Sequence, residues 1–413
     1  MSKHARDRRP YIKPVTRLEL SETNIKLRWI AIAVLLAIAV VAIGYGFSIA
    51  LRTEPGWEQV TAASNEVNCG ADFVLMYDFG AGDVNPTAQH KKLEALYTQL
   101  TEEGYRLFSA EAEGTDNLYH LNTHVNETVT VAPGLYRALE QIAASGSRYV
   151  FMGPVKKLYD PVFLSATDAE AALYDPMKNP GLAGETAAFC ADPEMVSLEL
   201  LGNYQARMNV SDAYLAFAEE SGIETFLDLG WMTNAFIIDY MAEELANQGF
   251  VYGYLSSFDG FTRNLDIRGE GYSLNIFHCA DNTVYMPAVL EYSGPMSLVT
   301  LRNYPMSDRD RWNYHAYSDG WITTVFLDPK DGSSKSSIDG MTAYSRETGC
   351  ARILLEIAPV FITDAFDAYA LESLENEGIH SVYCQDQGVI YTEENAQLSI
   401  QDPAYKIYYH SVK

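Results

Sequence analysis

An uninterrupted hydrophobic stretch lies near the N-terminus of the chain. Residues 29–51 contain no charged side chain, and Ile, Ala, Val and Leu fill most positions. At about 1.5 Å per residue, a helix over this stretch would be roughly 34 Å long, which is enough to cross a hydrocarbon core of about 30 Å. Arg28 and Arg52 close the stretch, and Trp29 lies where interfacial aromatic residues are found. The pattern predicts one transmembrane helix.

Beyond this stretch, segments with helical and strand periodicity alternate. Residues 88–103 place apolar side chains at helical spacing, and Pro133 begins a second helical pattern that ends near Gly146. Residues 166–191 are rich in turn formers and show no clear period. Short strands are predicted where Val, Ile, Tyr and Phe gather, over residues 72–78, 250–255, 273–278, 322–327 and 380–383.

These patterns predict a simple division of the chain. We expect a tail over residues 1–28, the transmembrane helix over 29–51, a polar connector over 52–68, one folded domain over 69–400 and a C-terminal tail over 401–413. Because helices and strands alternate without a repeat or an obvious linker, the fold class is mixed α/β (α+β), with mixed sheets flanked by helices in a single large domain.

Charge differs strongly between the two sides of the predicted helix. Residues 1–28 hold eight Lys and Arg against three acidic residues, whereas the whole chain has 29 Lys and Arg against 55 Asp and Glu, a formal net charge of −26. Basic flanks stay in the cytoplasm, so we expect a single-pass protein of the cell membrane with its N-terminus inside and its main domain outside. Such an acidic surface argues against nucleic acid as a partner.

A cleaved signal peptide is the rival interpretation of residues 29–51. The hydrophobic stretch is longer than a usual signal-peptide core, and no convincing small-residue cleavage site follows it. All five cysteines follow the stretch, where disulfides can form, but their spacing is not that of a zinc site. One or two disulfides of unknown connectivity and buried free thiols therefore both remain open.

The segment from Phe226 to Asp239 carries the most informative motif. A strand that ends in Asp228-Leu229-Gly230 runs directly into a helix, and Asp239 follows eleven residues after Asp228. This motif resembles the signature of the FAD:protein FMN transferases, also called ApbE-like flavin transferases, which reads roughly Asp-Leu-Gly-Gly-Ile-Ala-Lys-Gly with a later Asp. The family pattern is broken at Trp231, Asn234 and Ala235.

Further segments follow in the order of the family's motifs and cover most of residues 70–395. They are Leu118–Asn122 with Val129–Val131 and the Pro133 helix, Met152–Val155, Asp259-Gly260, Phe326–Gly332, and Thr363–Tyr369, which resembles a late helix. Each motif alone is weak, and the resemblance to the family rests on their common order and spacing. The resemblance implies an ApbE-like domain.

The resemblance also implies a chemistry and a set of site residues. Family members lie outside the membrane and use Mg²⁺ to transfer FMN from FAD, their substrate, to a Ser or Thr of an acceptor protein. The Mg²⁺ ligands implied here are the Asp364 carboxylate and the backbone carbonyl of Thr233, and no catalytic residue is assigned. The implied cofactor-binding residues are Asn122, Asp228, Gly230, Asn234, Asp239, Gly260 and Asp328.

Several family positions carry different chemistry in this chain. A Thr ligand, a His and a Lys of the family correspond to Ala368, Val325 and Asn234. Trp231 adds bulk where the family has glycine, and Asp259 adds a negative charge where a diphosphate would lie. The retained residues also fit ordinary roles in turns and helices. Two hypotheses follow: an anchored transferase with weakened activity, or an inactive relative that acts as a flavin-binding or envelope scaffold protein.

Overall fold

The computed structural model describes residues 33–36, 39–40, 53–63, 67–82 and 84–410. The chain divides into two compact units, residues 1–53 and residues 54–413. The predicted basic tail and most of the predicted transmembrane stretch lie outside the described residues. Among the residues that are described, no helix combines the length and the hydropathy needed to cross a membrane.

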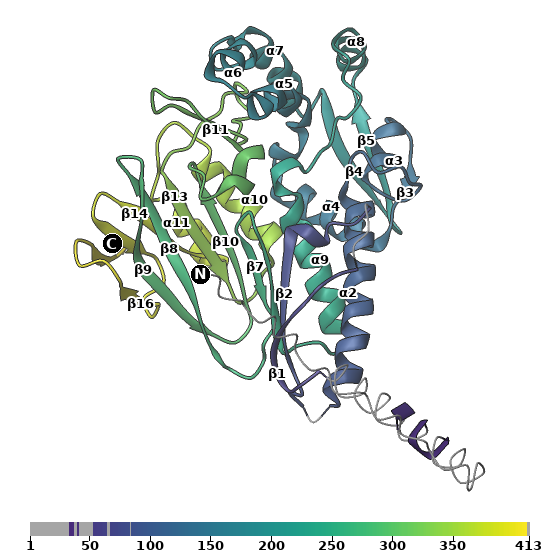
Figure 1. The fold of residues 1–413 in the computed structure, drawn as a ribbon. Coiled ribbons are helices and arrows are strands. Elements are labelled where there is room, and N and C mark those ends of the chain that lie inside the picture. Colours follow the sequence, from purple (N-terminus) through teal and green to yellow (C-terminus); the bar gives the residue numbers. More distant parts are fainter. Residues whose placement is uncertain (1–32, 37–38, 41–52, 64–66, 83, 411–413) are drawn as a thin grey trace, which may run out of the picture. The chain divides into compact units, whose positions relative to one another are not determined.

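A nine-stranded sheet runs through residues 54–413 (Figure 1). Its order is β1-β2-β6-β7-β10-β13-β14-β15-β17, and every neighbouring pair is antiparallel except the parallel pair β15 and β17. The strands are β1 (Gly56–Val60), β2 (Phe73–Phe79), β6 (Gly253–Ser257), β7 (Phe261–Asn264), β10 (Met296–Arg302), β13 (Gly340–Ser345), β14 (His380–Gln385), β15 (Gly388–Tyr391) and β17 (Lys406–Tyr409).

Three smaller sheets complete the strand content of the described residues. The order is β3-β5-β4 in one three-stranded sheet and β16-β9-β8 in another, and β11 pairs with β12. The strands are β3 (Val129–Thr130), β4 (Val196–Gly202), β5 (Gln205–Val210), β8 (Gly271–Ala280), β9 (Thr283–Ser293), β11 (Tyr314–Ala316), β12 (Ile322–Thr324) and β16 (Gln397–Ile400).

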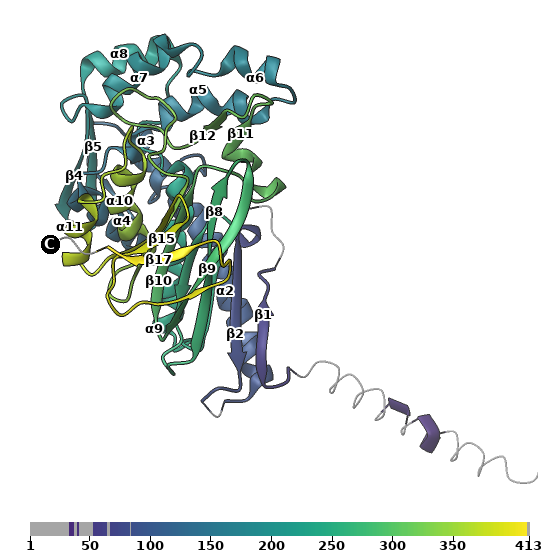
Figure 2. The ribbon, with the colours of Figure 1, turned by 90° about the vertical axis from the view of Figure 1, so that its left-hand side faces the viewer.

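Helices lie along one face of the large sheet, where α2, α9 and α10 pack side by side (Figure 1). Helices α5, α6, α7 and α8 gather at one end of the domain (Figure 2). The bounds are α2 (Pro86–Phe108), α3 (Leu118–Thr123), α4 (Pro133–Ser145), α5 (Gly153–Leu164), α6 (Asp168–Tyr174), α7 (Pro180–Ala191), α8 (Asp212–Ser221), α9 (Thr233–Asn247), α10 (Cys350–Phe361) and α11 (Ala370–Asn376).

Strand alternation produces two hydrophobic cores on the two faces of the large sheet. In β10, Val299 and Leu301 join the main core beneath the helices, whereas Met296 and Leu298 face a second core. The second core also holds Leu290 of β9, so the sheet β16-β9-β8 covers the face opposite the helices. Successive side chains of a strand point to opposite faces, which is why one strand supplies both cores.

Several predicted elements are confirmed. The helix predicted over residues 88–103 is the core of α2, which Pro86 begins at N1 and the Asn85 side chain caps. The Pro133 pattern is α4, which ends at Gly146 with φ +63°, a left-handed cap that glycine adopts without strain. The strands predicted over 72–78, 273–278 and 380–383 are β2, β8 and β14. Strand 250–255 begins later, as β6.

Other predictions were wrong. The supposed connector 52–68 contains β1, and the supposed tail 401–413 contains β17, so both are strands of the large sheet. Residues 166–191 contain α6 and α7. Neither helix presents a regular apolar stripe, which is why this part of the sequence shows no clear period. The expected late helix at Thr363–Tyr369 is a loop, and α11 begins only at Ala370.

All five cysteines are free thiols. Cys69, Cys190, Cys350 and Cys384 are buried, and burial is the main reason that their pKa values are raised. The alternative of one or two disulfides is therefore wrong for this structure. The buried thiols act as small apolar groups in the core.

Candidate functional site

Asn122 lies on α3 and fixes the segment that leads to the Asp228 turn. Its Oδ1 accepts the backbone N–H groups of Phe226 and Leu227 at 2.9 and 3.0 Å. Its Nδ2 donates to the carbonyls of Leu227 and Leu118 at 2.8 and 3.1 Å. The buried amide is thus occupied by backbone groups of the protein, and its role in this structure is to hold the chain ahead of Asp228.

The Asp228 turn is closed by its own hydrogen bonds. The Oδ1 atom of Asp228 accepts the N–H of Gly230 at 2.9 Å, and Gly230 has φ +53°, which favours glycine. The Thr233 hydroxyl donates to the Gly230 carbonyl at 2.7 Å. Thr233 is the first residue of α9, so the helical pattern directs its carbonyl toward the N–H of residue 237. The predicted carbonyl ligand therefore lies inside a helix turn.

Asp239 is fully engaged in holding α10. Its Oδ1 pairs with Arg263 Nη1 at 2.6 Å and accepts the N–H of Cys350 at 2.9 Å. Its Oδ2 accepts the N–H of Ala351 at 2.8 Å. A buried carboxylate at the N-terminus of a helix satisfies donors that have no partner within the helix and complements its dipole. Asp239 is therefore a structural anchor between α9, β7 and α10.

Asn234 and Asp259 form a pair at the position where a diphosphate was expected. Asn234 Nδ2 donates to Asp259 Oδ2 at 3.0 Å, and Asp259 Oδ1 is buried without a hydrogen-bond partner among the described residues. Burial raises the pKa of Asp259 to about 6. At neutral pH this carboxyl is charged and repels an anion. The neighbouring Gly260 has φ +108°, and a Cβ there would lie 2.6 Å from the Thr300 carbonyl.

Bulky side chains fill the space around the turn. Trp231 packs edge to face on Phe326 with ring centroids 4.9 Å apart, and Val325 lies beside them. The two cavities that border Trp231 measure about 20 and 10 Å³, the first next to Asp259 and the second next to Asp228. On this measure each cavity has room for about one water molecule, so neither admits a flavin ring or a diphosphate. We call Trp231, Val325, Phe326, Asp228 and Asp259 the closed centre.

A lysine occupies the position next to the predicted Mg²⁺ ligand. Lys335 Nζ lies 3.0 Å from Asp364 Oδ1, 3.0 Å from Asp331 Oδ2 and 3.2 Å from Asp328 Oδ2. Burial opposes its charge, but contacts with Asp331, Asp364 and Asp328 outweigh burial and raise the pKa of Lys335. The ammonium group is therefore charged at every physiological pH and neutralises the carboxylates that a metal ion would need.

The donor set does not fit a bound Mg²⁺. Asp364 lies on the loop after α10 with its side chain 86% exposed, and it has no helical partner one turn later. Within the described ranges no group of three or more His, Cys, Asp or Glu residues is arranged to hold a metal ion. Mg²⁺ requires an octahedral shell of oxygen atoms, and here the nearest cation is Lys335.

A large cavity of about 1170 Å³ lies beside this lysine. Trp321, Tyr304 and His278 line it together with amide side chains. It contains one lysine against five aspartates, namely Asp281, Asp331, Asp339, Asp364 and Asp386. Such a lining repels a dianion such as FAD, so the volume alone does not make it a flavin site.

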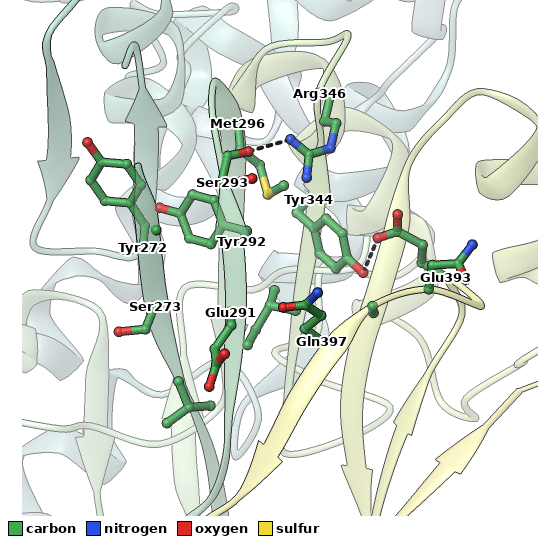
Figure 3. Close-up of a pocket in the computed structure, with 15 residues that line it drawn as sticks. Tyr272, Ser273, Glu291, Tyr292, Ser293, Met296, Tyr344, Arg346, Glu393 and Gln397 are labelled. Atoms are coloured by element: carbon green, nitrogen blue, oxygen red, sulfur yellow. Dashed lines mark hydrogen bonds between the residues drawn. The ribbon is translucent and has the colours of Figure 1, made fainter. Parts of the chain in front are cut away.

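A second cleft, of about 530 Å³, contains none of the predicted site residues (Figure 3). Tyr272 and Tyr292 form one wall, Tyr344 and Glu393 lie opposite, and Arg346 lies at the end near Ser293. The one sign of this cleft in the sequence is a tyrosine near the start of β8 and another near the end of β9. Their convergence depends on the hairpin register that places Tyr272 opposite Tyr292.

Sequence reasoning also missed Lys335. It follows the predicted Asp328 turn by seven residues, and only the hairpin closed by the Leu327–Ser334 bridge returns it to Asp328. Thus the structure brings Asp328 and Asp364 together through Lys335, and brings Asp228, Gly230, Asn234 and Gly260 around Trp231. Asn122 and Asp239 serve the backbone that surrounds this centre.

Comparisons with known proteins were made at the level of sequence and of structure. No protein-family model and no curated protein sequence matches the chain. The ApbE protein of Thermotoga maritima has a TM-score of 0.55 at 13% identity, over 84% of this chain and 97% of its own. The flavin transferase ApbE of Vibrio cholerae has a TM-score of 0.54 with the same identity and coverage. The protein therefore has the fold of the ApbE flavin transferases.

Proposed function

We propose that this protein has the fold of a flavin transferase but no longer cleaves FAD, and that it acts as a binding or scaffold protein. We propose further that it is anchored in the cell membrane with its domain outside. The observation that carries the proposal is the closed centre. Trp231 and Phe326 fill the space beside the Asp228 turn, and the bordering cavities of about 20 and 10 Å³ are too small for any part of FAD. The residues that resemble a cofactor site serve instead to hold the fold.

The electrostatics of the centre support the same conclusion. Breaking the diphosphate of FAD requires cationic groups that stabilise developing negative charge on phosphate oxygens. Here Asp259 adds a carboxylate, Asn234 is bonded to it, and the charge of Lys335 is already balanced by three carboxylates. If Mg²⁺ were bound, it would supply that stabilisation, but its implied ligand Asp364 is paired with the Lys335 ammonium group.

Membrane anchoring remains part of the proposal and rests on the sequence alone. The uncharged stretch 29–51 and the basic residues ahead of it support an anchor with its N-terminus inside. Extraction of cell membranes with alkaline carbonate tests this. An anchored protein stays in the pellet, and protease added to intact spheroplasts digests the domain. Release into the supernatant, or protection from the protease, contradicts the anchor or its orientation.

A weakened transferase is the second candidate function. The cavity of about 1170 Å³ beside Asp364 favours it, because a flavin nucleotide could enter there without displacing Trp231. In that case a partner protein would present a Ser or Thr at the cavity. The five aspartates of the lining are the reason that we rank this function second.

One experiment separates the two functions. The full chain, purified in detergent, is incubated with FAD and Mg²⁺, and release of AMP is followed by chromatography, with the Vibrio cholerae flavin transferase as positive control. We expect no AMP from this protein and no quenching of FAD fluorescence at concentrations on the order of 0.1 mM. Release of AMP that depends on Mg²⁺ would overturn the first proposal, because FAD cleavage is the step that it holds to be lost.

A further inference from the structure

The cleft in Figure 3 lies along β9 where its pairing with β16 ends, beside Met296 of β10 and Tyr344 of β13. We call it the aromatic cleft, and it is lined by Tyr272, Ser273, Glu291, Tyr292, Met296, Tyr344, Arg346, Glu393, Asn395 and Gln397 together with smaller neighbours. Its volume of about 530 Å³ lies within the range of small-molecule sites, about 300–1000 Å³. None of the residues of the closed centre lines it, so it can be considered independently of flavin chemistry.

The floor of the aromatic cleft is part of the second hydrophobic core. Leu290 of β9 packs in this core with Met296 and Tyr344 of the large sheet, and all three are at most 4% exposed. A floor that is already packed does not need to fold around a ligand, so the cleft is largely preformed. A preformed shape lowers the ordering cost of binding.

Three charged side chains of the cleft are held in place by neighbours. Arg346 Nη1 donates to the Ser293 carbonyl at 2.6 Å, and the Tyr344 hydroxyl donates to Glu393 Oε2 at 2.8 Å (Figure 3). Glu291 Oε1 accepts the hydroxyl of Ser399 at 2.7 Å. Each group keeps further donors or acceptors, because one hydrogen bond uses only part of its capacity.

Two amide side chains add both donors and acceptors. Asn395 and Gln397 border the cleft, and neither side chain hydrogen-bonds to another group within the described part of the chain. An amide presents two N–H donors and a carbonyl acceptor side by side. This geometry matches neighbouring hydroxyl groups on a ring, each of which both donates and accepts.

Aromatic rings continue from the cleft across the surface. Tyr292 and Tyr272 are stacked, with centroids 5.7 Å apart and planes at 24°. Tyr272 in turn lies 6.2 Å from Tyr254 and 6.2 Å from Trp57, which is 45% exposed. Aromatic faces carry partial negative charge and attract the C–H groups of a sugar ring, whose apolar face is otherwise costly to solvate.

We propose that the aromatic cleft binds a neutral oligosaccharide, with one sugar unit in the cleft and the next on the rings that lead toward Trp57. With two carboxylates, Glu291 and Glu393, against Arg346, the lining has a small negative charge that disfavours an anion such as a nucleotide. The polar lining also disfavours a lipid tail.

The test is titration of the purified full chain with the tetrasaccharides of N-acetylglucosamine, cellulose and starch, followed by calorimetry. We expect at least one of them to bind with a Kd on the order of 0.1–1 mM, typical of a few hydrogen bonds and one stacked ring. Gln397→Ala should weaken that binding about tenfold, the loss expected for hydrogen bonds to an amide. Gln401→Ala, at an exposed glutamine four residues later outside the cleft, should leave it unchanged.

Two outcomes would overturn the proposal. One is the absence of binding by all three tetrasaccharides at concentrations on the order of 10 mM. The other is binding that Gln397→Ala and Gln401→Ala affect equally, which would place the ligand elsewhere. Tyr292→Phe, which keeps the ring and the fold, should retain most of the affinity if stacking is the main contact. Neither outcome depends on whether FAD is cleaved, so this proposal and the proposed function can fail separately.

Discussion

The polar side chains of Asn122 and Asp239, which surround the closed centre, are hydrogen-bonded to groups of the protein itself, whereas two exposed amides that border the aromatic cleft are not, in the described part of the chain. Asp239 satisfies an arginine and two backbone N–H groups, and Asn122 satisfies four backbone groups. In the cleft, Gln397 and Asn395 make no hydrogen bond within the described residues. The difference is what the two proposals require, because Asn122 and Asp239 have no bonding capacity left for a ligand, whereas the two amides have.

The largest expected effect comes from removing the anchor of α10. Asp239→Ala leaves Arg263 buried without its partner and two N–H groups at the start of α10 unsatisfied. We expect a loss of about 3–5 kcal/mol in the free energy of unfolding, as for other broken buried pairs. Urea denaturation followed by fluorescence measures it. Glu291→Ala in the aromatic cleft is the matched control and should change stability by less than about 0.5 kcal/mol. Equal effects of the two variants would contradict the comparison.

The next effect concerns the side chain that fills the closed centre. Trp231→Ala removes the ring that packs on Phe326 and should cost about 2–4 kcal/mol of stability, because the remaining side chains cannot collapse into the space completely. We expect the variant still not to bind FAD, since Asp259 stays in place. Trp312→Ala, at a tryptophan that is 53% exposed, is the control. FAD binding by the Trp231 variant alone would show that steric closure, and not charge, keeps flavin out.

Much of the fold could be predicted from the sequence because local patterns determine it. Helix starts and stops and the spacing of apolar residues predicted α2 and α4, and the order of weak motifs predicted the ApbE-like fold. The β1 strand was missed because its burial alternates too little to stand out, with one buried residue in five. The helices α6 and α7 were missed because short helices without an apolar stripe leave no periodic signal.

The site was harder to predict because its meaning lies in contacts between distant residues. The motifs assigned Asp328 to cofactor binding and Asp364 to Mg²⁺, but nothing local shows that both contact Lys335. Likewise, the sequence shows Trp231 at a position where the family motif has glycine, but only the structure shows that its ring packs on Phe326. Side-chain partners separated by about a hundred residues cannot be inferred from spacing in one chain.

Asp259 provides a test through pH. Burial raises its pKa to about 6 in the folded state, above the value of about 3.9 expected for an unfolded chain, so the folded state binds the proton more tightly. Stability should therefore fall as pH rises from about 4 to about 6 and stay lower above that. The contribution is at most about 3 kcal/mol. The urea concentration at the midpoint of unfolding, determined at several pH values in this range, measures the change in stability.

Variants at two carboxyl groups identify the source of that pH dependence. Asp259→Asn should flatten the slope and raise stability at pH 8, because a neutral amide can occupy the site without the desolvation cost of a charge. Glu220→Gln, at an exposed glutamate of α8, should leave the slope as it is. A slope that survives in the Asp259 variant would assign the effect to other groups.

The smallest effect on stability, and the sharpest on ligand chemistry, is expected at Lys335. Its ammonium group contacts three carboxylates, and Asp328 among them is buried, so Lys335→Met leaves a cluster of negative charge without a cation. We expect a loss of about 1–2 kcal/mol in stability, reduced by the exposure of Asp364 and Asp331 to solvent.

We also expect Mn²⁺ and Ca²⁺ to bind the variant at least about tenfold more tightly than the natural chain, since oxygen ligands then lack a competing ammonium group. Electron paramagnetic resonance of free Mn²⁺ measures the binding, and Lys330→Met, at an exposed lysine of the same loop, is the control. If the natural chain already binds Mn²⁺ as tightly as the Lys335 variant, the lysine does not occupy the place of a metal ion, and the inference that it prevents metal binding among these carboxylates is wrong.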